Sequence, residues 1–170
     1  MSKVIFLDFD GVLNTALWHS QANRDKLKDK YGYKFDPNAV ANLKKILDKT
    51  GADIVISSSW KCIGLAELHK MWKERCLPGK VIGVTPNSLS DEILLSANLD
   101  DFHKTNIRGS EIKEWLMLYG KDVSHYAILD DVYDILPEQE SHFVWTNPVV
   151  GITEGNAMQA IMILNNLENN

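Results

Sequence analysis

The sequence predicts an α/β fold in which a mostly parallel, five-stranded sheet lies between two layers of helices. Short apolar runs alternate along the chain with longer segments whose apolar residues recur at helical spacing. Strands that alternate with helices in this way form parallel sheets with right-handed crossovers. The predicted strands are residues 4–7, 53–57, 81–84, 126–129 and 142–145. The predicted helices lie near residues 37–50, 65–72, 110–119 and 154–167.

The helices are further supported by signals at their ends. Asp36 and Pro37 are typical of an N-cap followed by proline at the first helical position, and Gly51 supplies the stop of that helix. Ser110 is expected to cap a later helix, and Thr153 is expected to cap the last one.

Length and composition are those of a single globular domain spanning residues 1–170. Hydrophobic residues make up 45% of the chain, and no apolar run approaches the ~20 residues of a membrane span. The apolar run at the N-terminus is too short for a signal peptide. Cys62 and Cys76 lack zinc-site spacing, so we interpret them as free thiols of a cytoplasmic protein. The net charge of −5 argues against nucleic-acid binding through an overall basic field.

Acidic side chains directly follow two of the predicted strands. Asp8 and Asp10 follow the first strand, where Gly11 lets the backbone turn, and Asp130 and Asp131 follow the fourth. A solvated turn would explain either pair alone. Ligand sites of parallel sheets lie at the carboxyl ends of the strands, so four carboxylates are expected at one edge, where they repel one another unless a cation lies between them. The sequence therefore predicts a divalent-cation site, with Mg²⁺ the expected ion where a phosphate completes its ligands.

Two further features of the same edge suit an anion. The second strand ends in Ser57, Ser58 and Ser59, where hydroxyl and backbone N–H groups can hold a phosphate. Arg108 stands just before the helix that Ser110 is expected to cap. Neither feature is decisive alone, since serines are common in loops and arginines in surface ion pairs. Together with the carboxylates, they supply the nucleophile, the charge neutralisation and the proton donor that phosphoryl transfer requires.

Several motifs of the chain resemble those of a known family. They are D-x-D-G-V-L-N at 8–14, IVISSSW at 54–60, Arg108 with Glu111 to Leu116, Asp130–Asp131 and Gly151–Thr153. With these motifs, roughly residues 3–155 resemble the haloacid dehalogenase-like (HAD) superfamily, and more narrowly the small HAD-domain family of "Swiss army knife" RNA repair proteins. The resemblance implies a Rossmann-like three-layer sandwich. It also implies a capless type, because no insertion is large enough for a cap domain.

The resemblance implies a role for each acidic residue. Asp8 resembles the nucleophile that forms an aspartyl-phosphate, and Asp10 resembles the general acid/base that serves first the leaving oxygen and then water. Asp130 resembles a direct Mg²⁺ ligand, and Asp131 a second ligand or a partner of one. The expected metal site comprises Asp8, Asp10, Asp130 and Asp131. An aspartate at the position of Asp10 implies a phosphatase.

The resemblance also implies roles for polar residues. Ser57 matches the hydroxyl that binds the phosphoryl group, with Ser58 as an alternative one residue further on. Arg108 takes the place of a cationic clamp, with Lys104 as an alternative, and acts by charge and geometry because arginine keeps its proton. We further expect four residues to contact the substrate: Gly11, Asn14, Ser58 and Trp60.

The resemblance further implies an open site that suits a bulky phosphoester, with substrate choice determined mostly by a flap of about residues 12–35 and by the loop 85–107. Residues 24–49 hold eight Lys/Arg and four Asp/Glu, a net charge of +4 that either forms a solvated face or guides a polyanion such as an RNA end. Trp18 and Trp60 either stack a base or pack in the core. Core positions are expected for Trp72, Trp115 and Trp145.

The predicted function is that of an Mg²⁺-dependent phosphomonoester hydrolase whose substrate is a nucleotide or a nucleic-acid end, as in RNA repair. Two alternatives remain, a small-metabolite phosphatase and a catalytically degenerate module that binds phosphorylated ends. A response-regulator receiver is disfavoured, because its adjacent acids follow the first strand whereas here they follow the fourth. We expect no membrane association and no obligate protein partner.

Overall fold

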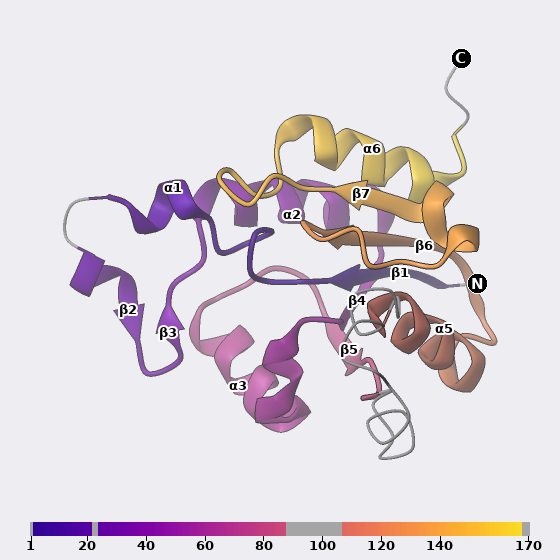
Figure 1. Ribbon diagram of the computed structural model, residues 1–170, viewed down its shortest axis with the longest axis horizontal. Helices are drawn as coiled ribbons and strands as arrows, with labels where there is room; N and C mark the ends of the chain where they lie inside the picture. Colours follow the sequence, from indigo (N-terminus) through magenta and orange to yellow (C-terminus); the bar gives the residue numbers. More distant parts are fainter. Residues whose placement is uncertain (1, 22–23, 88–106, 168–170) are drawn as a thin grey trace, which may run out of the picture.

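Five parallel strands form the central sheet of the protein. The computed structural model describes residues 2–21, 24–87 and 107–167, and Figure 1 shows how its elements are arranged. The strand order is β5-β4-β1-β6-β7, and every neighbouring pair is parallel, which confirms the predicted fold class. The strands are β1 (Ser2–Leu7), β4 (Asp53–Ile56), β5 (Val81–Val84), β6 (Val123–Asp130) and β7 (Phe143–Trp145).

The register of the central strand brings three strand ends together. Leu7, the last residue of β1, lies opposite Ile56 of β4 on one side and Leu129 of β6 on the other. The pairing continues one step beyond, where Asp8 N donates to the Leu129 carbonyl at 3.1 Å and Ser57 N donates to the Leu7 carbonyl at 3.0 Å. The residues that follow β1, β4 and β6 therefore meet at one edge of the sheet.

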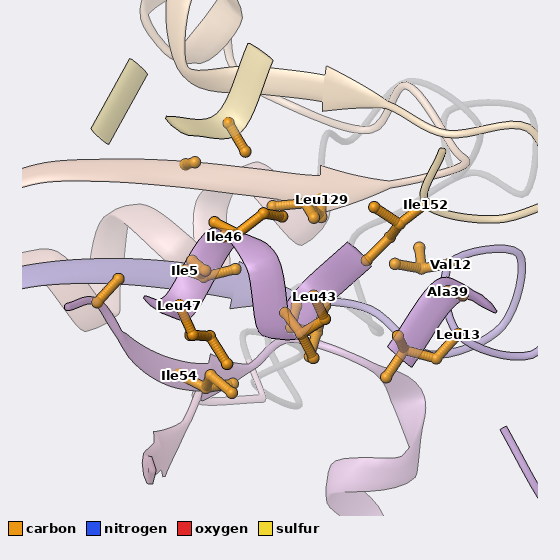
Figure 2. Close-up of a cluster of buried hydrophobic side chains, with 14 of the residues drawn as sticks. Ile5, Val12, Leu13, Ala39, Leu43, Ile46, Leu47, Ile54, Leu129 and Ile152 are labelled. Atoms are coloured by element: carbon orange, nitrogen blue, oxygen red, sulfur yellow. The ribbon is translucent and has the colours of Figure 1, made fainter. Parts of the chain in front are cut away.

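Helices cover both faces of the sheet, so the fold is a three-layer sandwich. The long helices are α2 (Pro37–Thr50), α3 (Leu65–Glu74), α5 (Ile107–Tyr119) and α6 (Glu154–Asn165). Side chains of β1 alternate between the layers. Ile5 belongs to the core that α2, α3 and α6 cover, together with Leu43 of α2 (Figure 2). Phe6 belongs to the core under α5, where its ring lies 5.4 Å from that of Trp115.

The predicted caps of two helices are confirmed. At the start of α2, the Asp36 side chain accepts a hydrogen bond from Asn38 N at 2.8 Å, and Gly51 ends the helix with a φ of +66°. At the start of α6, Thr153 Oγ1 accepts from Asn156 N at 3.2 Å, and the Asn156 side chain accepts from Thr153 N at 3.0 Å. These reciprocal bonds satisfy backbone donors that the first helical turn leaves free.

The predicted start of α5 is wrong by one turn. The helix begins at Ile107, so Ser110 lies inside it and does not cap it. Asp134, in the segment after β6, holds the helix start instead. Its carboxylate accepts from Arg108 N at 3.1 Å and its carbonyl accepts from Gly109 N at 2.9 Å. Because these acceptors come from a distant part of the chain, no local cap is needed, and Arg108 lies in the first helical turn rather than before it.

Two of the three tryptophans expected in the core are buried there. Trp72 and Trp115 are buried, but Trp145 is 61% exposed. Trp145 ends β7, which is an edge strand of the sheet, so the core does not enclose its ring. The indole Nε1 of Trp145 donates to the backbone carbonyl of Asp131 at 2.8 Å.

The described part of residues 12–35 forms a flap of short elements beyond the carboxyl ends of the strands (Figure 1). The flap contains α1 (Ala16–His19), η1 (Arg24–Leu27), β2 (Lys28–Asp29) and β3 (Gly32–Tyr33). Strands β2 and β3 form an antiparallel hairpin. Arg75, at the end of α3, donates two hydrogen bonds of 2.9 Å to the Asp29 carboxylate and so fixes the hairpin. Two short helices complete the described elements, η2 (Ser59–Ile63) and η4 (Pro137–His142).

Two further observations concern membrane spans and cysteine pairing, which the sequence analysis argued against. None of the helices within the described ranges is both long and apolar enough to cross a membrane. Cys62 and Cys76 are both exposed and unbridged, as predicted for free thiols.

Candidate active site

A cluster of three carboxylates lies at the edge where β1 and β6 end. Asp8, Asp130 and Asp131 each place an oxygen within 4.8 Å of the others. Asp8 is 6% exposed and Asp130 is 1% exposed, so both are removed from water. Burial raises the pKa of Asp8, and it raises the pKa of Asp130 to about 7, to which the nearby Asp8 contributes. Without a cation, this position is unfavourable for three negative charges.

Arg108 supplies one fixed positive charge to the cluster. Its Nη1 atom lies 3.4 Å from Asp8 Oδ1, and its Nε atom lies 3.5 Å from Asp130 Oδ2. Nη1 also donates a hydrogen bond to the backbone carbonyl of Ser57. The guanidinium therefore touches residues at the ends of β1, β4 and β6, and it opposes the effect of burial on the pKa of both carboxyls.

The donor set fits a divalent metal ion. Asp130 Oδ1 accepts a hydrogen bond from Val132 N at 3.0 Å, whereas the buried Oδ2 atom accepts none from the described residues. Three carboxylates that converge on one point offer the oxygen ligands that hard divalent cations prefer. Asp8, Asp130 and Asp131 are thus the residues that could hold the ion.

Because Gly11 has no side chain, it leaves room for the Asp131 carboxylate of this cluster. Its φ is +73°, and a Cβ atom built on it would lie 2.2 Å from the Cγ atom of Asp131. Thr146 Oγ1 donates to the Gly11 carbonyl at 3.0 Å and holds the turn from the side of β7. Gly11 therefore lies against a carboxylate of the candidate metal site.

Asp10 stands apart from the carboxylate cluster and is held by two side chains. Asn14 Nδ2 donates to its Oδ1 atom at 2.8 Å, and Trp60 Nε1 donates to its Oδ2 atom at 3.0 Å. Its own carboxylate is exposed to solvent. Asn14 and Trp60, which we expect to contact the substrate, thus orient Asp10. Trp18, which lies in the flap, donates through its Nε1 atom to the Lys34 carbonyl at 3.1 Å.

The two candidate serines differ in their contacts. Ser58 is fully buried, its side chain forms a hydrogen bond with Asp8 that lowers the pKa of that carboxyl, and its Oγ atom accepts from Trp60 N at 3.4 Å. Ser57 is 1% exposed, and its Oγ atom has no hydrogen-bond partner among the described residues. The hydroxyl of Ser57 is therefore the one that remains available to a phosphoryl oxygen.

Sequence reasoning missed a buried ion pair beside Arg108. Lys61 Nζ lies 2.5 Å from Glu111 Oε2, and it also donates to Thr85 Oγ1 at 3.1 Å and to the Pro86 carbonyl at 2.8 Å. Both charged side chains are only 9% exposed. Burial lowers the pKa of Lys61, and Glu111 opposes that shift. One signal was available, since Glu111 follows Arg108 by three residues on the same helix face.

The same ion pair lines a cavity next to the carboxylates. The cavity has a volume of about 320 Å³, and its walls include Ser57, Lys61, Arg108, Glu111 and Asp134. Two cations and a buried hydroxyl therefore border one space. Lys104 lies outside the described residues, as does most of the loop 85–107 in which we expect substrate selection.

A comparison with known protein families shows the family of the chain. The family of HAD domains in Swiss Army Knife RNA repair proteins matches residues 4–157. The chain belongs to this family. The matched segment runs from β1 into α6 and includes the carboxylate cluster, Ser57 and Arg108. No curated protein and no solved structure shows significant similarity to the chain.

Family membership fits the architecture of the site. Because the chain belongs to this family, it is a hydrolase of the HAD superfamily. HAD domains generally use a divalent metal ion. The carboxylate cluster at the end of β1 and β6 is the place in this HAD domain where such an ion fits.

Proposed function

We propose that the chain is an Mg²⁺-dependent phosphomonoesterase that forms an aspartyl-phosphate on Asp8. The observation that carries this proposal is the position of Arg108. Its guanidinium lies within 3.5 Å of Asp8 and of Asp130 and also bonds the Ser57 carbonyl. A fixed cation beside a carboxylate nucleophile suits the charge that develops on the oxygens of a transferring phosphoryl group.

Asp8, Asp130 and Asp131 would hold the Mg²⁺ ion. When bound, the ion would offset the negative charge that otherwise keeps a phosphate away from Asp8. The carboxylate of Asp130 fits this role because one of its buried oxygens accepts no hydrogen bond from the described residues.

Asp8 and Asp10 carry the chemical steps of the proposed mechanism. In the first step, an Asp8 oxygen attacks phosphorus, the bond from phosphorus to the leaving oxygen breaks, and Asp10 gives that oxygen a proton. In the second step, Asp10 takes a proton from water, and the water oxygen attacks phosphorus. The bond between phosphorus and Asp8 then breaks and phosphate leaves. Arg108 keeps its proton throughout and balances charge on the phosphoryl oxygens.

Two kinds of contact position these groups. Asn14 and Trp60 hold the two oxygens of Asp10, so that its carboxylate is fixed where a leaving oxygen would emerge. The hydroxyl of Ser57, which has no hydrogen-bond partner in the part of the chain that the structure describes, would donate to the phosphoryl group. In this proposal, Ser58 acts indirectly, through its hydrogen bond with Asp8.

The proposed substrate is a nucleotide or a phosphorylated nucleic-acid end. The family's occurrence in RNA repair proteins supports this choice. Residues 26–34 of the flap add four lysines against one acid, which favours an anionic partner. We also propose that the whole chain works as one capless domain in the cytoplasm.

A substrate panel tests the proposal. Phosphate release with Mg²⁺ is measured for mononucleotides, for oligonucleotides phosphorylated at the 3′ or the 5′ end, and for sugar phosphates. We expect nucleotide or oligonucleotide phosphates to react fastest, and Asp8→Asn to lose about a thousandfold or more in kcat. Preference for sugar phosphates would favour a small-metabolite phosphatase. Tight binding of phosphorylated ends without turnover would identify a degenerate binding module.

A further inference from the structure

A groove of about 640 Å³ opens beside Trp60, between the tip of the β2–β3 hairpin and η2. Its lining includes Lys30 and Tyr31 from the hairpin, and Trp60, Cys62 and Ile63 from η2. We propose that this groove binds the nucleobase of the nucleotide that carries the reacting phosphate. The inference rests on the proposed phosphomonoesterase function and adds to it a site for the leaving group.

The groove lies on the leaving-group side of the proposed reaction. Trp60 Nε1 donates to Asp10 Oδ2 at 3.0 Å, so the tryptophan joins the proposed proton donor to the groove. In an in-line displacement, the leaving oxygen departs on the side opposite Asp8 and meets the residue that protonates it. Atoms attached to that oxygen therefore lie next to Trp60, and a nucleoside leaving group is the size of unit that reaches the groove.

The walls of the groove are flat and apolar. Tyr31 and Trp60 offer aromatic rings, and Ile63 offers an aliphatic side chain that is 42% exposed. Aromatic rings bind nucleobases by stacking and tolerate any base, because every base has a π-face. A sugar phosphate or an aliphatic alcohol would leave these rings exposed to water. A planar aromatic ligand therefore fits the groove better than either.

The walls are also fixed in advance. Tyr31 OH bonds Glu67 at 3.3 Å, and Tyr31 N bonds the Asp29 carboxylate at 2.8 Å. Arg75 holds the same carboxylate, and its guanidinium lies 5.9 Å from the centroid of the Trp60 ring. A ring held in place loses little conformational entropy when a ligand stacks on it, which favours binding.

Charged side chains of both signs stand at the rim of the groove. Lys30 stands at the rim, with its Nζ atom 4.9 Å from the centroid of the Tyr31 ring. Lys30 also pairs with Glu74 at 2.9 Å, and Glu67 lines the groove, so the charges at the rim are largely balanced. The apolar walls of the groove therefore suit the uncharged base of a nucleotide, while its phosphate lies at the carboxylates beyond Trp60.

Two cysteines provide a test that does not depend on turnover. Cys62 lines the groove and Cys76 lies outside it, and both are exposed. Alkylation of each thiol by N-ethylmaleimide is followed by mass spectrometry, with and without an unphosphorylated dinucleotide. At ten times its Kd, the dinucleotide should slow alkylation of Cys62 about tenfold and leave Cys76 unchanged. Unprotected Cys62 at a dinucleotide concentration that saturates the protein in a separate calorimetric titration, or no binding in that titration, would overturn the inference.

A paired substrate test measures the contribution of the base to turnover. One oligonucleotide ends in a normal phosphorylated nucleotide, and the other ends in the same nucleotide without its base. We expect kcat/KM to favour the substrate with the base by about tenfold or more. Tyr31→Leu should reduce that ratio at least about threefold. Tyr33→Leu, in the same hairpin but outside the groove, should leave it as in the wild type.

The outcomes separate the inference from the proposed function. If the wild type hydrolyses neither oligonucleotide, the phosphomonoesterase proposal fails, and the cysteine experiment alone decides the groove. If the wild type hydrolyses both at the same rate, the function stands and the nucleobase site is overturned. An unchanged ratio in a Tyr31→Leu variant that melts at the wild-type temperature would also overturn it.

Discussion

Gly11 and Asp131 are packed so closely that a Cβ atom on Gly11 would lie 2.2 Å from the Cγ atom of Asp131. Gly11 also has a φ of +73°, in the left-handed region that favours glycine. The turn after β1 therefore needs glycine for its backbone conformation and for the space that it leaves to a carboxylate of the candidate metal site.

A methyl group at Gly11 should displace the Asp131 carboxylate and weaken metal binding. We expect Gly11→Ala to raise the Mg²⁺ concentration for half-maximal activity about tenfold or more. It should also lower the free energy of unfolding by about 1–2 kcal/mol. Gly51→Ala is the matched control, since Gly51 has a φ of +66° and no atom of the described residues lies within 4 Å of its Cβ position. The control should lose stability alone. Unaltered Mg²⁺ dependence in Gly11→Ala would argue against Asp131 as a ligand.

Asp130 should make the stability of the metal-free protein depend on pH. Burial raises its pKa to about 7, with Asp8 adding to the shift and Arg108 opposing it. Between about pH 4 and about pH 7, the folded state therefore holds a proton that the unfolded chain releases, so the free energy of unfolding falls as pH rises. Urea titrations in EDTA at about pH 5 and about pH 7.5 should differ by roughly 1–4 kcal/mol.

The isosteric variant Asp130→Asn provides the control for this pH dependence. It carries no titrating group at the buried position, so its metal-free stability should vary less with pH. Mg²⁺ should raise the melting temperature of the wild type near neutral pH, because the ion binds the ionised carboxylates of the folded state. Its effect on Asp130→Asn should be much smaller. Equal pH dependence in the two proteins would show that the stability change arises elsewhere.

Much of the site could be predicted because it depends on topology. Apolar runs identify the strands, and strands that alternate with helices run parallel, so the residues after β1 and β6 had to meet at one edge. That rule alone brings Asp8 to Asp130. The caps of α2 and α6 were equally predictable, because the hydrogen bonds to the backbone that cap them span only two or three residues.

The features that sequence reasoning missed depend on contacts between distant residues. The start of α5 is set by Asp134, which is 26 residues away from Arg108. Trp60 donates a hydrogen bond to Asp10, which lies 50 residues away in the sequence. Sequence reasoning could not predict this contact and offered only stacking on a base or burial in the core for the Trp60 ring. Trp145 is exposed because β7 is an edge strand, and strand order is a property of the assembled sheet.

The two serines after β4 should affect catalysis in different ways. Ser57→Ala removes a hydroxyl that no described residue engages in a hydrogen bond, so kcat/KM should fall about ten- to a hundredfold at every pH, as for a hydrogen bond to a charged group. Ser58→Ala removes the hydrogen bond that lowers the pKa of Asp8. The pKa of Asp8 should therefore rise, and the acidic limb of the kcat/KM profile should move to higher pH. The opposite pattern, with the limb moving in Ser57→Ala alone, would exchange the two roles.

The buried pair of Lys61 and Glu111 should contribute strongly to stability and to the position of Arg108. Lys61→Met leaves Glu111 buried without its 2.5 Å partner, so we expect a loss of about 3–5 kcal/mol in the free energy of unfolding. Lys113→Met is the control, because Lys113 lies on α5, the helix that carries Glu111. Lys113 pairs with Glu138 at 2.9 Å, but both side chains are more than half exposed, so this loss should be below about 1 kcal/mol.

The double variant Lys61→Met/Glu111→Leu separates stability from positioning. An apolar pair of similar volume should restore most of the stability that Lys61→Met loses, because no buried charge is left unpaired. If the ion pair also positions Arg108, kcat should stay low in the double variant while urea unfolding returns toward the wild type. Recovery of both kcat and stability would show that the pair is structural only, and that Asp134 alone holds the helix turn that carries Arg108.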